Sequence, residues 1–226
     1  MIKKGFTLAE VLISLAIIGI IAAVTLPSLM TDTTAAQIGP KLAKASSALE
    51  QANMALLNEY GVDAIKDTGL ITTENNNTSI DGYIDKLTNH MKASEYTIIN
   101  EGTSGANTCI TSTYSANSTG ILAADGTIYS FNYATGTEND APHKCYIGEV
   151  FININGEAKP NEYGTDIFAF AWYNDGSLRP VGGNNWKEGD DDACTWTEKC
   201  DKDATPSDPL ACAGHIFENN LKVLYK

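Results

Sequence analysis

The N-terminal part of the chain contains one long apolar segment. The 20 residues 11–30 carry no charge and are mostly leucine, isoleucine, alanine and valine. A helix rises about 1.5 Å per residue, so this segment predicts a helix about 30 Å long, the thickness of a hydrocarbon core. Lys3 and Lys4 precede the segment and the next basic residue is Lys41. By the positive-inside rule, we expect a single-pass helix with its N-terminus in the cytoplasm.

The pattern becomes amphipathic after Asp32. Apolar residues then recur at spacings of three and four, which places them on one face of a helix. They are Ile38, Leu42, Ala45, Leu49, Ala52, Leu56 and Tyr60. Gly39-Pro40 allows a bend, and Gly61 is suited to a C-cap. We therefore expect the helix to continue through residues 31–61 and to pack on a sheet.

Residues 62–226 predict a globular head. Residues 62–120 are rich in Asn, Thr, Ser and Gly and indicate a loop region. Beyond them, short apolar runs flank dipeptides typical of hairpin turns. These dipeptides are Asp125-Gly126, Asn155-Gly156 and Asp175-Gly176. Consecutive hairpins predict an antiparallel sheet with one face covered by the amphipathic helix, which is an α+β fold. Residues 182–212 indicate an acidic, glycine-rich loop, and residues 215–224 a short helix or strand.

The composition is acidic. The chain has 28 Asp and Glu residues against 15 Lys and Arg residues, for a formal net charge of −13 among 226 residues. Such a surface repels phosphate backbones, so we expect no direct binding of nucleic acid. The length suits one globular domain with an appendage.

A cleaved secretory signal is the simplest interpretation of an apolar N-terminus. Such signals have a shorter apolar region of about 7–15 residues, followed by a small-residue site for which Thr34-Ala35-Ala36 could serve. The apolar run is longer than that, and the carboxylate of Glu10 stands at its start. A lone acid at a bilayer centre costs about 2.5–3.5 kcal/mol. Glu10 is therefore predicted to be functional and to have a partner.

The residues around Glu10 resemble a known processing signal. Lys3-Lys4-Gly5-Phe6-Thr7-Leu8-Ala9-Glu10, followed by the apolar helix, is similar to the class III signal of type IV pilins and of type II secretion pseudopilins. The resemblance implies that prepilin peptidase cuts between Gly5 and Phe6 and methylates the new amine. Residues 1–5, with Lys3 and Lys4, would be the discarded leader, and residues 6–30 the retained transmembrane and assembly helix. Loss of both lysines would change the net charge from −13 to −15.

The same resemblance implies how the helix is used. Glu10 would pair with the methylated Phe6 amine of a neighbouring subunit, which sets the register of assembly. Gly19 and Pro27 correspond to positions where the helix can lose helicity inside a filament, and Pro27 should loosen it near residues 23–24. The implied partners are other pilin subunits, prepilin peptidase, a membrane assembly platform driven by a cytoplasmic ATPase, and the lipid bilayer. The head would lie in the periplasm or outside the cell.

Five cysteines lie on the exported side, where disulfides form. They are Cys109, Cys145, Cys194, Cys200 and Cys212. The preferred pairs are Cys109 with Cys145, and Cys212 with Cys194 or Cys200. A bridge to Cys212 would close the acidic loop, as the corresponding disulfide does in many pilins. The odd cysteine departs from that pattern.

The chain shows little sign of an active site. His90, His143 and His215 have no metal-ligand spacing, and the sequence has no nucleophile elbow, P-loop or C-x-x-C motif. An acidic cluster could hold calcium, as a C-terminal loop does in major pseudopilins. Its members are Glu188, Asp190, Asp191 and Asp192. Without a full calcium-loop spacing, a solvated loop is favoured, and no cofactor or metal is expected.

The favoured function is therefore a structural subunit of a type IV pilus or a type II secretion pseudopilus, with no enzymatic activity. One alternative is a minor pilin whose head is an adhesin or binding module. The other is an exported enzyme or binding protein released by signal peptidase, whose mature chain would start near Gln37. The segment 153–168 also resembles a strand–loop–strand found in many pilin-like heads.

Overall fold

A computed structural model describes residues 7–74, 77–99, 118–133, 146–182, 200 and 209–223. The chain forms two compact units, Met1–Gln37 and Ile38–Lys226. The boundary falls within the first helix. In chain order the elements are α1 (Leu8–Tyr60), η1 (Ile65–Thr68), β1 (Thr72–Glu74), β2 (Asn77–Ser79), α2 (Asp81–Met91), β3 (Ala93–Thr97), β4 (Thr119–Ala123), β5 (Ile128–Tyr133), β6 (Tyr146–Asn153), β7 (Ile167–Tyr173), β8 (Leu178–Pro180), η4 (Pro209–Ala211) and α3 (Cys212–Glu218).

Helix α1 ends as the glycine after it predicts. Gly61 has a φ of 65°, a left-handed conformation that glycine adopts without a steric cost. The Gly61 amide donates to the carbonyl oxygen of Asn58 at 3.3 Å, and the Val62 amide donates to that of Leu57 at 3.1 Å. This pair of hydrogen bonds is a Schellman motif, which satisfies carbonyl groups of the last turn. The predicted C-cap is confirmed.

The helix passes through Gly39 and Pro40 without interruption. The glycine is needed for a close approach between chain segments. A Cβ atom at Gly39 would lie 1.9 Å from the carbonyl oxygen of Leu221. The C-terminal segment after α3 therefore crosses α1 at a point where only a glycine fits.

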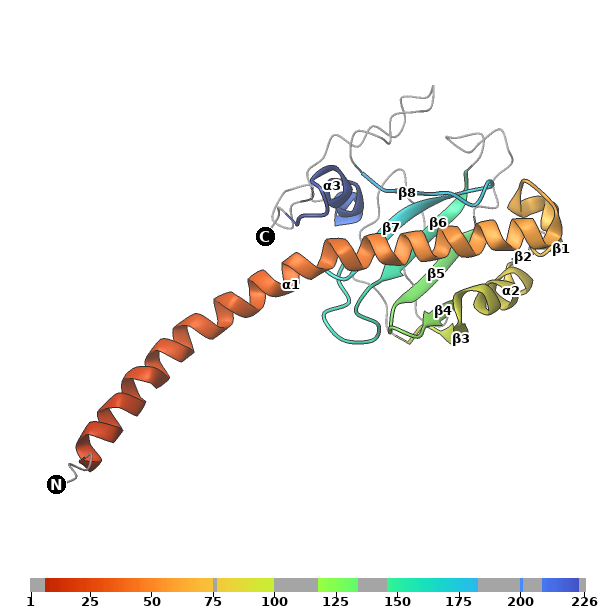
Figure 1. The fold of residues 1–226 in the computed structure, drawn as a ribbon. Helices are drawn as coiled ribbons and strands as arrows, with labels where there is room; N and C mark the ends of the chain where they lie inside the picture. Colours follow the sequence, from red (N-terminus) through yellow and green to blue (C-terminus); the bar gives the residue numbers. More distant parts are fainter. Residues whose placement is uncertain are drawn as a thin grey trace. The chain divides into compact units, whose positions relative to one another are not determined.

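Six antiparallel strands form the sheet of the head, in the order β3-β4-β5-β6-β7-β8. Neighbours in the sheet are neighbours in the sequence, so the sheet is a meander (Figure 1). The turn dipeptides Asp125-Gly126 and Asp175-Gly176 join β4 to β5 and β7 to β8. Both glycines have a positive φ, 88° and 85° respectively, as tight hairpin turns require.

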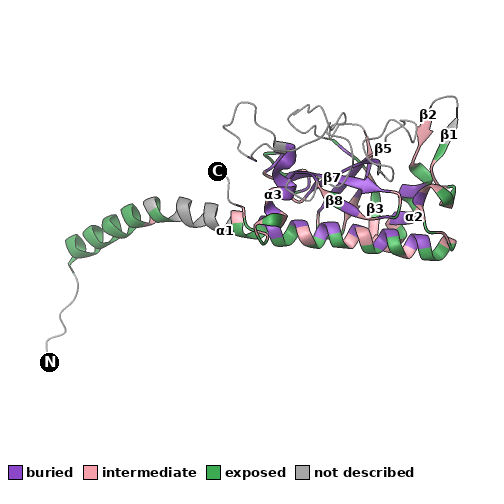
Figure 2. Ribbon diagram, turned by 90° about the horizontal axis from the view of Figure 1, so that it is seen from above, coloured by how far each residue is buried: buried purple, intermediate pink, exposed green. Residues whose placement is uncertain are grey.

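The part of α1 within the head covers one face of this sheet. Leu42, Leu49 and Leu56 are fully buried, and each contributes about 1.5–3 kcal/mol to folding by leaving water. Figure 2 shows buried positions recurring along this part of the helix. The Tyr129 hydroxyl, from β5, donates to the carbonyl oxygen of Ala45 at 3.1 Å. The predicted α+β fold, a long helix on an antiparallel sheet, is confirmed.

The opposite face of the sheet is also covered. All seven residues of β7 are buried, so both of its faces are shielded from water. A second apolar cluster gathers Ile98, Phe151, Ala169 and Leu210, among others. The sequence predicts cover for only one face. The head therefore has two apolar layers, one on each side of the sheet.

The prediction of a loop for residues 62–120 is wrong for residues 62–99, the part in which the structure describes regular elements. This region contains the helix α2, the strand β3 and the small β1–β2 hairpin. Three residues of α2, Tyr83, Ile84 and Leu87, are fully buried and stabilise the helix by tertiary packing despite its polar composition. The Tyr83 ring lies 4.9 Å from the ring of Trp172, centroid to centroid.

The predicted helix or strand near the C-terminus is the helix α3. It lies against the sheet, since the Gly214 amide donates to the carbonyl oxygen of Val181 at 2.8 Å. Phe217 meets Phe170 of β7 edge to face, with centroids 6.0 Å apart.

Candidate assembly site on the N-terminal helix

Glu10 closes the first turn of α1 by bonding back to Thr7. The Thr7 amide donates to Oε2 of Glu10 at 2.8 Å, and the Thr7 hydroxyl donates to the same oxygen at 2.7 Å. The Glu10 amide in turn donates to the Thr7 hydroxyl oxygen at 3.3 Å. This reciprocal arrangement is a capping box, which satisfies amides that a helix N-terminus leaves without partners. It holds the Glu10 carboxylate in one orientation, with both bonds from Thr7 on Oε2.

Thr7 also belongs to the site, as the hydrogen-bond partner of Glu10. The pattern Thr-x-x-Glu directly before an apolar run is the sequence signature of a capping box. That signal, read on residues 7–10, would have identified Thr7 as the partner of Glu10 within the subunit.

The first turns of α1 expose large apolar side chains. Leu8, Ile13, Ile18 and Ile20 are each more than 60% exposed, and Leu8 reaches 80%. A contiguous exposed apolar surface marks a region that contacts a partner or lipid. Within the described part of the chain, no helix is both long enough and apolar enough to cross a membrane.

The polar groups on this surface are satisfied within the helix. The Ser14 hydroxyl donates to the carbonyl oxygen of Glu10 at 2.8 Å, and the Thr25 hydroxyl donates to that of Ile21 at 2.9 Å. Because each hydroxyl donates to the carbonyl oxygen four residues earlier, it needs neither water nor another subunit as a hydrogen-bond acceptor. A Cβ atom at Gly19 would meet none of the described residues within 4 Å, so no contact with them explains a glycine at this position. This surface can therefore move into apolar surroundings, and the free-energy cost of doing so is that of desolvating the Glu10 carboxylate.

Several predicted site residues cannot be placed. Lys3, Lys4, Gly5 and Phe6 precede the first described residue. Pro27 lies within the bounds of α1, but its side chain belongs to the part that is not described. The predicted cleavage, the methylation and the loosening near Pro27 stay predictions.

The structure joins Cys200 to Cys212 by a disulfide bond with a sequence separation of 12. Of the two partners predicted for Cys212, the structure selects Cys200. Both cysteines are at least 94% buried. Cys212 is the first residue of α3, and both cysteines belong to the apolar cluster that α1 covers. Cys109, Cys145 and Cys194 lie outside the described residues, so their pairing stays a prediction.

The acidic cluster at residues 188–192 also falls outside the description. Among the described residues, no three side chains of His, Cys, Asp or Glu gather to hold a metal ion. Of the three histidines, His90 of α2 lies 2.9 Å from Oε2 of Glu59 on α1, and His215 lies in α3. His143 is not described.

Comparison with known proteins identifies the N-terminal segment. Residues 1–26 match the family model of the prokaryotic N-terminal methylation motif. No curated protein and no solved structure matches the chain.

The motif and the fold together define a class of protein. The chain is a prepilin-like protein with a class III signal at residues 1–26 and the α+β arrangement of a pilin. Thr7 and Glu10, which form the capping box, lie within the matched segment.

Proposed function

We propose that this protein is a structural subunit of a type IV pilus or a type II secretion pseudopilus. Prepilin peptidase cleaves between Gly5 and Phe6 and methylates the Phe6 amine, and the apolar helix anchors the subunit in the inner membrane. An assembly platform then moves the helix into a filament, where it packs against the helices of other subunits. The observation that carries this proposal is the exposed apolar surface of α1 with one oriented carboxylate at its start.

Glu10 sets the register of assembly in this proposal. A carboxylate and an ammonium are each costly in an apolar environment, but they attract strongly there because the dielectric constant is low. Oε2 of Glu10 already accepts both bonds from Thr7, and Oε1, to which no described residue donates, is the oxygen that would accept the Phe6 amine of the neighbouring subunit. Gly19 leaves room for the close approach of an adjacent helix, since small residues line such contacts.

Mass spectrometry of the mature N-terminus tests the processing step. We expect the chain recovered from membranes to begin with N-methylated Phe6. A mature chain that begins near Gln37 would show release by signal peptidase and contradict the proposal.

Substitution of Glu10 tests the assembly step. Glu10→Ala and Glu10→Val should leave membrane insertion intact and abolish incorporation into filaments, measured by immunoblot of sheared filaments against membranes. Ser14→Ala, which removes a hydroxyl bonded within the helix, is the matched control and should assemble normally. Wild-type filament yield from either Glu10 variant would contradict the role given to the carboxylate.

A further inference from the structure

Helix α1 has a weak point where the head unit begins. The head unit starts at Ile38, and Gly39 and Pro40 follow it within the helix. Glycine and proline are the two least favourable residues in a helix interior. Pro40 also lacks the amide that would donate to the carbonyl oxygen of Ala36. By its own sequence, the part of α1 in the head should bend most readily at this pair, yet the helix is continuous there.

The chain after α3 crosses α1 at this weak point. We call residues 219–223 the C-terminal strap. The carbonyl oxygen of Leu221 lies where a Cβ atom of residue 39 would be, so Gly39 is buried although Pro40 is exposed. The side chains of Leu221 and Val223 pack against the core cluster that α1 covers. Figures 1 and 2 show α3, which precedes the strap, beside the first turns of α1 in the head.

The backbone of the strap includes an unfavourable conformation. Asn220 and Leu221 have φ angles of 54° and 62°. The left-handed Asn220 ends α3, because it lets the Leu221 amide donate to the carbonyl oxygen of Ile216 at 2.9 Å, as in a Schellman motif. Leu221 has no such role, and a bulky residue at positive φ is an outlier. Such a conformation persists only where the surrounding structure holds it, and here the contact with Gly39 does so.

We infer that the C-terminal strap locks a hinge in α1 at Gly39 and Pro40. While the strap is docked, its backbone covers Gly39 and keeps the helix continuous across the pair. When the strap leaves, Leu221 returns to an ordinary φ and α1 is free to bend. The inference does not rest on the proposed function, because the strap and the hinge both belong to the head unit.

Glycine at position 39 serves both states of this device. A side chain there would keep the strap off α1, and any residue except proline would strengthen the helix at the hinge. Relief of the strain at Leu221 offsets part of the free-energy cost of releasing the strap. The strap is therefore poised to open.

Hydrogen exchange of the full-length protein in detergent tests the docking of the strap. Gly39→Ala should raise the exchange rates of the amides of residues 220–223 about ten-fold or more, because the added Cβ atom displaces the Leu221 carbonyl group. The amides of β6 and β7 should keep their wild-type rates. Gly19→Ala is the matched control on the same helix, since its Cβ atom would meet none of the described residues within 4 Å. Unchanged exchange in the strap, or an equal rise in β6 and β7, would overturn the inference.

Distance measurements between two spin labels test the hinge. Labels on non-natural amino acids at Ile21 and Gln51, both exposed, would be about 45 Å apart in a straight helix. A chain that ends at Asn219 lacks most of the strap, and its distance distribution should be about twice as wide as that of wild type or wider. Pro40→Ala in the shortened chain should restore the wild-type width, because it removes the hinge. Pro27 is present in every variant, so its effect cancels in the comparison.

Rescue by Pro40→Ala separates a hinge from a general loss of stability, because a partly unfolded head would stay heterogeneous after that substitution. A wild-type width in the shortened chain would overturn the inference. A broad distribution that Pro40→Ala does not narrow would overturn it as well.

Discussion

The Tyr83 hydroxyl donates a hydrogen bond to Oδ1 of Asn53 at 2.5 Å, and both residues are fully buried. Nδ2 of the same Asn53 donates to the carbonyl oxygen of Gly176 at 2.8 Å. One amide on α1 therefore connects α2 to the turn between β7 and β8. A buried polar network of this kind stabilises the fold when each member is satisfied and is costly when one is removed.

Tyr83→Phe should destabilise the head by about 1–3 kcal/mol, because it leaves a buried acceptor on Asn53 without a donor. The measurement is urea unfolding of the full chain in detergent, followed by fluorescence. Tyr60→Phe is the matched control, since Tyr60 is only partly buried and its hydroxyl has no described hydrogen bond. A loss below about 0.5 kcal/mol for Tyr83→Phe would contradict the role given to this bond.

Gly176→Ala should destabilise the head through both conformation and contact. Gly176 has a φ of 85°, and an added Cβ atom would lie 2.9 Å from Cβ of Asn53. We expect the free energy of unfolding to fall by at least about 2 kcal/mol, because the alanine backbone would be strained and the turn would be pushed away from α1.

Gly126→Ala separates the two causes. Gly126 has a similar φ of 88°, but its Cβ atom would meet nothing within 4 Å. It should show only the conformational cost, about 1–2 kcal/mol. Equal losses in the two variants would show that contact with Asn53 contributes nothing.

Cys212→Ser should destabilise the head by about 2–3 kcal/mol, because the Cys200–Cys212 bond closes a loop with a sequence separation of 12. Reduction of the wild-type protein should have at least the same effect. Peptide mapping under non-reducing conditions should recover residues 200 and 212 in one crosslinked fragment. A fragment that joins Cys212 to Cys194 instead would contradict the pairing.

The Lys44–Asp125 pair should give a small, acid-sensitive contribution to stability. The hydrogen bond from Lys44, 2.7 Å long, holds the pKa of Asp125 below its ordinary value of 3.8. Because the folded-state pKa is lowered, the contribution is present above pH 3.8 and is lost as the pH falls through the folded-state pKa. Both side chains are well exposed, so we expect at most about 1 kcal/mol at neutral pH.

Substitution of the lysine measures this contribution. The difference in free energy of unfolding between wild type and Lys44→Met should shrink as the pH falls below 3.8. Lys41→Met, which removes a lysine without a described ion pair, should leave the stability of the head unchanged at all pH values. A Lys44→Met difference that grows toward acid pH would refute the assignment.

Much of the fold could be predicted because local chemistry and tertiary structure agree. Asp125-Gly126 and Asp175-Gly176 form the hairpin turns that their sequence indicates, and Gly61 caps α1. The stripe from Ile38 to Leu56 is buried on the sheet. In each case the residue type requires a conformation that the fold also needs.

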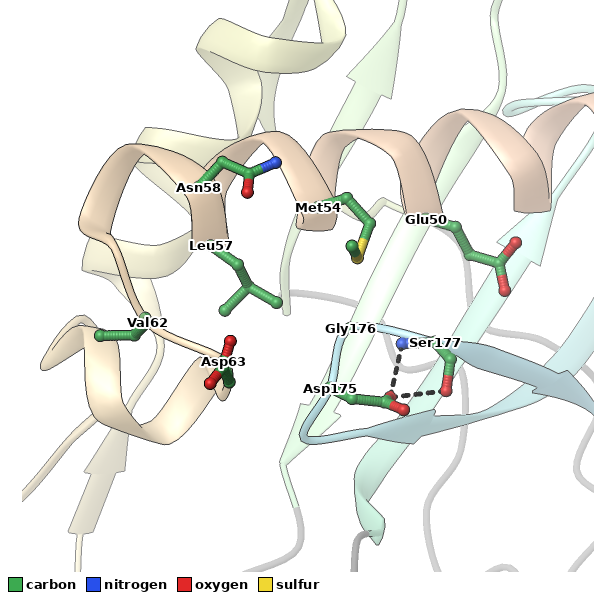
Figure 3. Close-up of a pocket in the computed structure, with 9 residues that line it drawn as sticks. All are labelled: Glu50, Met54, Leu57, Asn58, Val62, Asp63, Asp175, Gly176 and Ser177. Carbon is green, nitrogen blue, oxygen red and sulfur yellow. Dashed lines mark hydrogen bonds between the residues drawn. The ribbon is translucent and has the colours of Figure 1, made fainter.

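The features of the fold and the site that were not predicted depend on contacts between segments that are distant in the sequence. Helix α2 was not predicted because the sequence around it is dominated by Asn, Thr and Gly. Tyr83 and Leu87 stabilise the helix by packing in the core, which the local sequence does not reveal. The choice of Cys200 over Cys194 could not follow from spacing, because both precede Cys212 by a number of residues that a disulfide can bridge. The groove that Glu50 and Met54 of α1 form with Asp175 (Figure 3) also escaped prediction, since it joins a helix to a turn more than 100 residues away in the sequence.

The order of the six strands determines which strands of the head could pair with another copy. Strands β3 and β8 are the edges of the sheet, and exposed edges invite uncontrolled strand pairing. Strand β8 has only three residues and ends at Pro180, which has no amide to donate. Strand β3 carries the exposed charge of Glu95. Both edges are thus poor templates for aggregation, so copies of the head can accumulate at high density without forming amyloid-like ladders.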